Sequence, residues 1–429
     1  MTEASEKEEH VEYSPFAKNL ECLLENIESL NTTFPLIMVV LSEIGKNRAK
    51  EHLEFLEKNG TLSSEEENKK SYTLDQKHLH NAKRIKKRSQ RISKSFDLIP
   101  RNFVVSLISE YDSFLGSLLK EFYIKKPELL NTIERQLTFS ELASYKSIEE
   151  AREYILEKEV EGFLRKSHVE HFQLLENKFS IDLRKGLESW SKFVELTERR
   201  NLFVHCNGTV SSQYIKTCKE NGETNSDIKI GDKLDADRKY VEETFEIINE
   251  ISIKLTHVLW RKVFPEERKT ADNALLSLSF ELLQEERYKL VINILDLFVN
   301  TIKKFHDETF KRMIIVNLAI AYKLSDQKDK CSKELSRLDW SATNYAFKMA
   351  NSVLNEEYDK ASSYMQNAVS TKELSEYQFL EWPLFKEYRE SEQFTKSFTE
   401  LFGKEPFETE SVDTDDEGTD DSSDEEHDN

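Results

Sequence analysis

Two residues in the middle of the chain, Arg200 and His205, are of the types needed to cleave an RNA phosphodiester bond without a metal ion. Internal attack by a ribose 2'-hydroxyl needs a base for the hydroxyl proton, an acid for the leaving 5'-oxygen and a cation for the phosphate charge. A histidine, whose ordinary pKa lies near neutrality, and a permanently charged arginine are the minimal set for these roles. The pair is therefore suited to cleavage of RNA, a reaction that would need no metal and no cofactor.

The spacing of the two residues raises a geometric problem. Apolar residues recur at helical spacing over 182–205, and Asn207 and Gly208 predict a left-handed stop directly after that helix. Five residues along an ideal helix correspond to a rotation of about 140°, so Arg200 and His205 do not share one face. They can meet only if the last turn unwinds, or if two copies of the chain pair across a two-fold axis.

The run from Arg200 to Gly208 reads RNLFVHCNG and resembles the Arg-polar-x-x-x-His signature of HEPN domains. The segment Phe96–Asp112 resembles the subgroup called RiboL-PSP-HEPN, so the resemblance covers roughly residues 90–260. HEPN domains are helical bundles that commonly form homodimers in which two motifs face one cleft. Many are metal-independent endoribonucleases of toxin–antitoxin, abortive-infection and other antiviral defence systems. The resemblance implies the same for this chain.

The resemblance also implies roles for four residues. Arg200 and His205 are the expected catalytic pair, Asn201 is expected to position the histidine or the phosphate, and Glu198 is expected to orient Arg200. Some relatives have lost activity and only bind partners, so the alternative function is a catalytically inactive interaction scaffold. In that case His205 caps a helix, and Arg200 pairs with Glu198 or Glu195 on a solvated surface.

A basic segment upstream is a second candidate for contact with RNA. Residues 77–94 hold eight Lys or Arg and no acid, and the candidates are Lys83, Arg84, Lys86, Lys87, Arg88 and Arg91. Such side chains can follow RNA phosphates, although a solvated helix face is an equally good interpretation. His168 and His171 have the i, i+3 spacing of metal ligands. No carboxylate or cysteine is positioned to complete that site, so we expect no metal.

Composition favours helices and an intracellular location. The 429 residues include only 10 Gly and 7 Pro, too few turn formers for a many-stranded β fold. The four cysteines lack CxxC or CxxH spacing, which suits the reducing cytoplasm. The N-terminus lacks the order of a signal peptide, and the longest apolar run, residues 34–41, is far short of the roughly 20 residues of a membrane span. We therefore expect a cytoplasmic protein without membrane contact.

Local patterns predict where the helices lie. We expect helices over 15–30, 35–58, 100–125, 147–165, 182–205 and 237–263, and an exposed loop over 59–72. Pro35 and Pro100 suit the first turn of a helix, and Ser147 with Glu150 has the spacing of a capping box. Beyond Pro265 a loose repeat aligns Val291 with Cys331 and Ala361.

These patterns predict an all-α chain in which a HEPN-like helical bundle is followed by a short TPR-like α-solenoid. The expected parts are an N-terminal helical segment with a disordered start (1–75), the HEPN-like domain (76–264), helical repeats resembling tetratricopeptide repeats (265–403) and a disordered acidic tail (404–429). The resemblance of the repeats implies a surface for a protein partner or an antitoxin.

The acidic tail dominates the net charge of −20. From Glu405 onward there are thirteen acidic residues and no Lys or Arg, and the rest of the chain holds 61 basic and 68 acidic residues. The body is therefore only weakly acidic, which leaves an anionic partner possible. The tail is either a solubilising segment or a mimic of nucleic acid that covers the basic segment.

Overall fold

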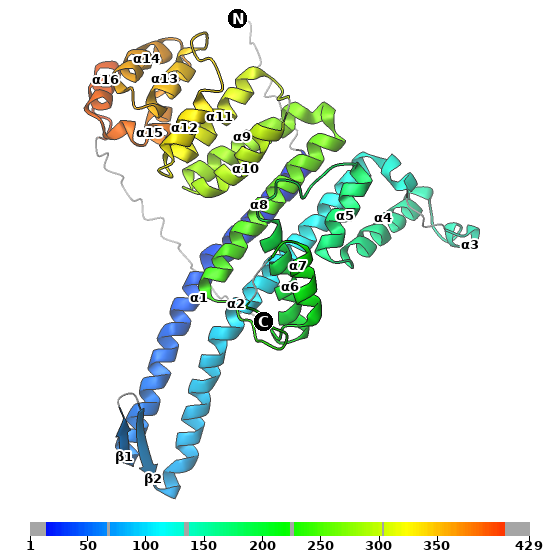
Figure 1. Ribbon diagram of the computed structural model, residues 1–429, viewed down its shortest axis with the longest axis vertical. Coiled ribbons are helices and arrows are strands. Elements are labelled where there is room, and N and C mark those ends of the chain that lie inside the picture. Colours follow the sequence, from blue (N-terminus) through cyan, green and yellow to red (C-terminus); the bar gives the residue numbers. More distant parts are fainter. Residues whose placement is uncertain (1–13, 67–68, 133–136, 224–226, 303, 408–429) are drawn as a thin grey trace, which may run out of the picture. The chain divides into compact units, whose positions relative to one another are not determined.

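The computed structural model describes residues 14–66, 69–132, 137–223, 227–302 and 304–407. Helices dominate this part of the chain (Figure 1), which confirms the predicted all-α class. The one sheet among these residues is an antiparallel hairpin of β1 (Gly60–Glu66) and β2 (Lys69–Leu74). The expected disordered start, and the acidic tail from residue 408 onward, lie outside the described residues.

The helices follow in chain order. They are α1 (Pro15–Asn59), α2 (Gln76–Lys125), α3 (Phe139–Leu142), α4 (Ile148–Leu164), α5 (His168–Phe179), α6 (Trp190–His205), α7 (Ser212–Glu220), α8 (Arg238–Val263), α9 (Arg268–Gln284), α10 (Tyr288–Thr301), α11 (Glu308–Lys323), α12 (Lys328–Leu335), α13 (Tyr345–Leu354), α14 (Tyr358–Ser370), α15 (Glu376–Glu381) and α16 (Glu392–Phe402). Short 3₁₀ turns cover Pro127–Thr132, Pro265–Glu267, Pro383–Phe385 and Tyr388–Glu390.

The chain divides into two compact units. Unit 1 holds the residues up to 279 together with 289–311, and unit 2 holds 280–288 and the residues from 312 onward. The boundaries that the sequence predicts at residues 75 and 264 both fall inside unit 1. Two sets of contacts, one aromatic and one polar, account for this difference.

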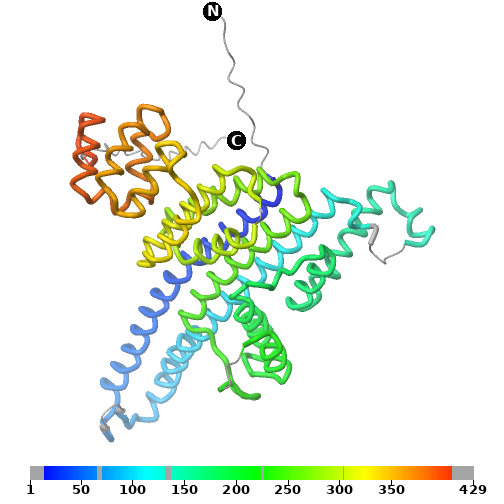
Figure 2. Tube along the Cα trace, turned by 45° about the horizontal axis from the view of Figure 1, so that its top comes forward, coloured from blue at the N-terminus to red at the C-terminus, as the bar shows by residue number. Residues whose placement is uncertain are grey.

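The aromatic contacts join α1 to the centre of unit 1. The fully buried Phe16 ring stacks on Phe122 of α2, with ring centroids 4.8 Å apart, and lies 5.4 Å from Trp260 and 5.2 Å from Phe264. Here α1, α2 and α8 lie side by side in both views (Figure 1, Figure 2). By length and composition alone α1 would be able to cross a bilayer. Its first turns are nevertheless part of the same hydrophobic core as α8.

The polar contacts join α8 to α10. The carboxylate of buried Glu250 accepts hydrogen bonds from Lys254 Nζ at 2.6 Å, from Ser189 Oγ at 2.9 Å and from Asn293 Nδ2 at 2.9 Å. A buried charge is tolerated only when it is paired and hydrogen-bonded. Because α10 supplies one of these partners, most of the first helix pair beyond Pro265 is part of unit 1, whereas residues 280–288 at the turn between them belong to unit 2.

Both long helices continue through a proline, so the helix starts predicted at Pro35 and Pro100 are wrong. A proline inside a helix removes one backbone hydrogen bond and crowds the preceding turn. Packing around each proline compensates, because the Phe34 and Phe103 rings lie 4.9 Å apart and Pro100 is itself buried.

The exposed loop predicted over 59–72 is also wrong, because this stretch forms the β1–β2 hairpin. Thr61 pairs with Thr73 and Leu62 with Tyr72. Threonine and tyrosine favour strands, and this preference prevails over the polar composition of the segment.

The helix pairs predicted beyond residue 265 share one local geometry. The helices α9, α11 and α13 are each followed, two or three residues after their last residue, by a left-handed residue, namely Glu286, Asp326 and Glu356, with φ of 58°, 61° and 61°. Five residues after each of these lies one of the aligned residues Val291, Cys331 and Ala361, all buried. The predicted register is confirmed, whereas the stacking of the pairs into a TPR-like solenoid stays a prediction.

Candidate functional site

The expected catalytic residues lie on α6, which begins at Trp190 rather than near residue 182. The backbone N–H groups of Leu183 and Arg184 both donate to the Glu176 carboxylate at 3.0 Å, and Gly186 has φ of 76°. These contacts hold the segment before α6 in turns. The predicted long helix therefore loses its first two turns but keeps the part that carries the motif.

The end of α6 is as predicted. The helix stops at His205, Asn207 and Gly208 take left-handed conformations with φ of 47° and 79°, and the N–H of Gly208 donates to the Leu202 carbonyl at 2.9 Å. A Cβ atom at Gly208 would lie 2.5 Å from the carbonyl oxygen of Leu234, so only glycine fits there.

Arg101 of α2 holds the loop that follows the motif. This buried side chain donates to Asn207 Oδ1 at 3.2 Å and forms an ion pair with Asp235. Its guanidinium also lies 5.4 Å from the centre of the Phe203 ring. Arg101 thereby ties both the last turn of α6 and the loop after it to α2.

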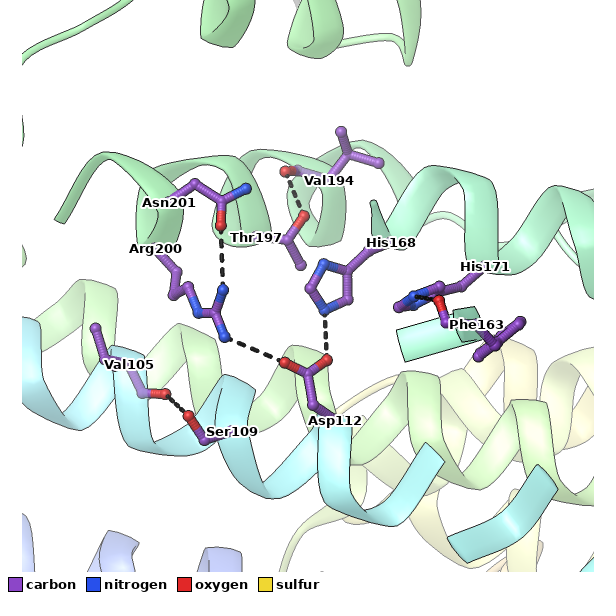
Figure 3. A network of polar contacts seen from close by, with 10 residues as sticks. All are labelled: Val105, Ser109, Asp112, Phe163, His168, His171, Val194, Thr197, Arg200 and Asn201. Carbon is purple, nitrogen blue, oxygen red and sulfur yellow. Dashed lines mark hydrogen bonds and ion pairs between the residues drawn. The ribbon is translucent and has the colours of Figure 1, made fainter. Parts of the chain in front are cut away.

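Arg200 points toward α2, where Asp112 holds it (Figure 3). Its Nη2 donates to Asp112 Oδ2 at 3.2 Å and its Nη1 donates to Asn201 Oδ1 at 3.2 Å. The other oxygen of Asp112 is hydrogen-bonded to His168 Nε2 at 2.8 Å. The Arg200 side chain remains 22% exposed, although its Nε is buried and has no hydrogen-bond partner among the described residues.

Glu198, the expected partner of Arg200, has another role. Its carboxylate accepts a hydrogen bond from Asn201, and burial raises its pKa, an effect that nearby His168 and the hydrogen bond partly offset. Glu195 does not pair with Arg200 either, because it binds Arg199 Nε at 2.6 Å. Asn201 therefore lies between Glu198 and Arg200, and Asp112 provides the carboxylate that we had assigned to Glu198.

His205 stands apart from this network. It is exposed at the end of α6, and no described residue forms a hydrogen bond or ion pair with its side chain. Arg200 and His205 are not in contact within one chain, as their spacing on the helix predicts. The structure thus brings together Arg200, Asn201 and Glu198 and leaves His205 free at the surface.

Asp112 and Arg101 were missed by the sequence analysis. They are eleven residues apart, about three helical turns, and therefore lie on the same side of α2. That side also carries buried Val104, Ile108 and Leu115. Two charged residues within an apolar helix face are a signal of buried partners, and this signal was available in the sequence.

Each histidine of the pair on α5 is hydrogen-bonded through Nε2, whereas the buried Nδ1 of His171 has no partner among the described residues. His168 binds Asp112, and buried His171 hydrogen-bonds through Nε2 to the Phe163 carbonyl at 2.9 Å and stacks on the Phe163 ring. Among the described residues no group of three or more His, Cys, Asp or Glu side chains is placed to hold a metal ion. Burial, together with the neighbouring His168, lowers the pKa of His171 to about 4.

The low pKa of His171 predicts that acid destabilises the fold. Between pH 6.5, the ordinary pKa, and about pH 4 the unfolded chain binds more protons than the folded one, so the free energy of unfolding falls as the pH falls. From pH 7 to pH 5 the wild type should lose about 2 kcal/mol more than a His171→Gln variant, whose side chain does not titrate. Urea unfolding of both proteins at the two pH values measures this, and equal losses would contradict it.

The comparisons with known proteins found no match for this chain. No protein-family model matches it. No curated protein and no solved structure matches it either. The likeness to HEPN domains therefore depends on two stretches of its own sequence, the RNLFVHCNG run from Arg200 and the segment Phe96–Asp112.

Proposed function

We propose that the protein is a HEPN-type, metal-independent endoribonuclease in which Arg200 of one copy acts beside His205 of a second copy. One observation carries the proposal: a single helix holds a guanidinium fixed by Asp112 and Asn201 and, one and a half turns later, an imidazole that is exposed and unpaired among the described residues. Two copies paired across a two-fold axis would place each fixed cation beside a free imidazole.

The reaction follows from the chemistry of the two groups. The neutral imidazole of His205 takes the proton of a ribose 2'-hydroxyl, and the oxygen attacks the adjacent phosphorus. The P–O5' bond breaks, and the imidazolium formed in the first step gives its proton to the leaving 5'-oxygen. Arg200 stabilises the extra negative charge on the phosphate oxygens. The products are a 2',3'-cyclic phosphate and a free 5'-hydroxyl.

Incubation of the purified protein with RNA in EDTA tests the proposal. We expect cleavage products that end in 2',3'-cyclic phosphate, detected by mass spectrometry. The absence of cleavage at every RNA and protein concentration, or products with other ends, would contradict it. By the same resemblance we propose that the enzyme works as a cytoplasmic toxin or antiviral effector. Expression in the host should then arrest growth, and His205→Ala should relieve the arrest.

Asp112 is expected to position Arg200 rather than to touch RNA. Replacing Asp112 by Ala frees the guanidinium to sample other directions, and misplacement of a charged group by about 1 Å can cost up to 100-fold in rate. We expect Asp112→Ala to lower kcat by about 10- to 100-fold with little change in KM, and Asp112→Glu to recover part of the loss. The exposed Asp97 on the same helix provides the control, Asp97→Ala. An unchanged kcat in Asp112→Ala would contradict this role.

The ion pair of Arg200 with Asp112 also favours a second candidate function. An arginine paired with a carboxylate can have a purely structural role, here the attachment of α6 to α2. In that case the chain is a catalytically inactive scaffold whose helix pairs recruit partners. The two functions differ in one measurement. If wild type and His205→Ala leave RNA equally intact in EDTA, the scaffold is the correct function.

A further inference from the structure

The outward side of α2 carries a row of exposed cations. The eight Lys and Arg of residues 77–94 are all exposed, and residues 76–96 contain no acid. On an ideal helix seven of the eight fall within a sector of about 140°. We call this sector the basic face of α2; it consists of Lys77, Lys83, Arg84, Lys87, Arg88, Arg91 and Lys94.

Most of these cations have no counter-ion among the residues that the structure describes. Lys77 approaches Asp75 at 3.6 Å, and among the described residues the other six make no ion pair. Elsewhere on the surface Lys and Arg are commonly paired within their own helix, as Arg48 is with Glu51. The basic face spans about 26 Å along the helix axis, enough to meet several phosphates of a polyanion.

The opposite side of α2 packs against α1. Ala82 and Ile85 are buried, and a Cβ atom at Gly45 of α1 would lie 3.7 Å from Ile92 and 3.4 Å from Phe96. The two helices run side by side through this stretch (Figure 1, Figure 2). The basic face is therefore directed away from α1 and lies on a helix whose other side is held in place.

The composition of the basic face points to a nucleic acid backbone. Residues 76–95 include no Phe, Tyr or Trp. Proteins that bind single strands combine cations with aromatic side chains on which bases stack, and this face lacks the second element. Phosphates of a double helix need cations alone, because their bases are already stacked.

An anionic membrane is the competing partner, and the position of the apolar side chains argues against it. Leu36, Val39 and Val40 of α1 are 63%, 67% and 59% exposed. They lie on the side of α1 opposite to Phe34, which contacts Phe103 of α2. A surface helix that binds membranes has its apolar and basic groups side by side at one interface. Here the two groups face away from one another.

We propose that the basic face of α2 binds the phosphate backbone of double-helical RNA. This deepens the proposed function by naming the structural class of its substrate, and the choice of RNA over DNA rests on that function. Binding by the basic face and cleavage by Arg200 and His205 are separable. A full-length His205→Ala protein therefore reports on binding whether or not the wild type cleaves.

The experiment measures binding of that full-length protein to a labelled 24-base-pair RNA duplex, to a 24-nucleotide oligo(U) strand and to vesicles of phosphatidylcholine with 30% phosphatidylserine. The test variant replaces Lys83, Arg84, Lys87 and Arg91 by Gln. The matched control carries the same charge change at four exposed lysines outside the basic face, namely Lys166, Lys216, Lys219 and Lys239. Thermal unfolding of both variants shows whether the fold is kept.

We expect the duplex to bind at least about 10-fold more tightly than oligo(U) at 50 mM salt, because single strands have the lower charge density. The test variant should lose about 100-fold in duplex affinity or more, and its plot of log K against log salt concentration should be shallower by about 3 units. The control should stay within about 3-fold of the parent. Equal loss in test and control, equal or tighter binding of oligo(U), or binding to vesicles alone would overturn the proposal.

Discussion

His205→Ala should lose RNA cleavage by about 10²- to 10⁴-fold, because removal of a general base or acid typically costs that much. The side chain is exposed and forms no hydrogen bond or ion pair with a described residue, so the variant should unfold at the same urea concentration as the wild type. Val204→Ala is the matched control, since Val204 precedes His205 in the same turn and is 50% exposed. A single-turnover assay in EDTA measures the rate. If His205→Ala cleaved RNA at the wild-type rate, the proposal of an endoribonuclease that uses His205 would be contradicted.

The proposed pairing of Arg200 of one copy with His205 of a second copy predicts a further result. Arg200→Ala should be inactive as well, because the charge on the phosphate loses its stabilising cation. A mixture of the two inactive variants forms mixed dimers in which one site has both an intact Arg200 and an intact His205. We expect the mixture to regain up to about one quarter of wild-type activity, the yield of random pairing with one good site of two. No recovery, under conditions where subunits exchange, would place both residues in one chain.

Phe16→Ala should destabilise the protein by about 3 to 5 kcal/mol, the usual cost of truncating a fully buried aromatic side chain. The ring contacts Phe122 of α2, Trp260 of α8 and Phe264 directly after α8, so the cavity cannot close by a small local shift. Leu36→Ala, on the exposed side of α1, should change stability by less than about 0.5 kcal/mol. Urea unfolding followed by circular dichroism compares the two.

The stability of Phe16→Ala shows whether the N-terminal segment folds separately or together with α8. If residues up to 75 formed a part of their own, Phe16→Ala would leave the unfolding of the α8 region unchanged. If Phe16→Ala and the wild type were equally stable, the result would support the domain boundary that the sequence predicts at residue 75. A loss of several kcal/mol in a single transition would show that α1 and α8 unfold together.

The parts of the fold that depend on local chemistry were predictable from the sequence. Ser147 caps α4 by accepting from the Glu150 N–H at 3.1 Å, at the predicted position. The stop after His205 follows from Asn207-Gly208, whose left-handed preference needs no distant partner. The helix predicted over 237–263 is α8, which runs from Arg238 to Val263 and has Asp237 as its cap.

The parts that depend on distant partners were not predictable in this way. Prolines at 35 and 100 stay within helices because residues far along the chain pack beside them. The start of α6 is set by Glu176, which satisfies two backbone N–H groups that a helix would otherwise use. The residues of the candidate site also fall into a group that local spacing predicts and a group that depends on distant partners. Arg200, Asn201 and His205 were recognisable from their spacing on one helix. A charge at Asp112 within an apolar helix face indicates a buried partner, but the identity of that partner was not predictable, because Arg200 lies 88 residues later.

The buried Glu250 limits how this gene can be divided or recombined. Its carboxylate accepts a hydrogen bond from Asn293, and a hydrogen bond to a charged group commonly contributes about 1.5 to 3 kcal/mol. A fragment that ends at residue 264 would lack α10, so the buried Glu250 carboxylate would lose the hydrogen bond from Asn293. A fusion that exchanged everything after Pro265 would do the same unless the new segment offered an equivalent donor. The smallest segment that can be transferred and still fold is consequently longer than the helices that carry the motif, and it extends at least as far as α10.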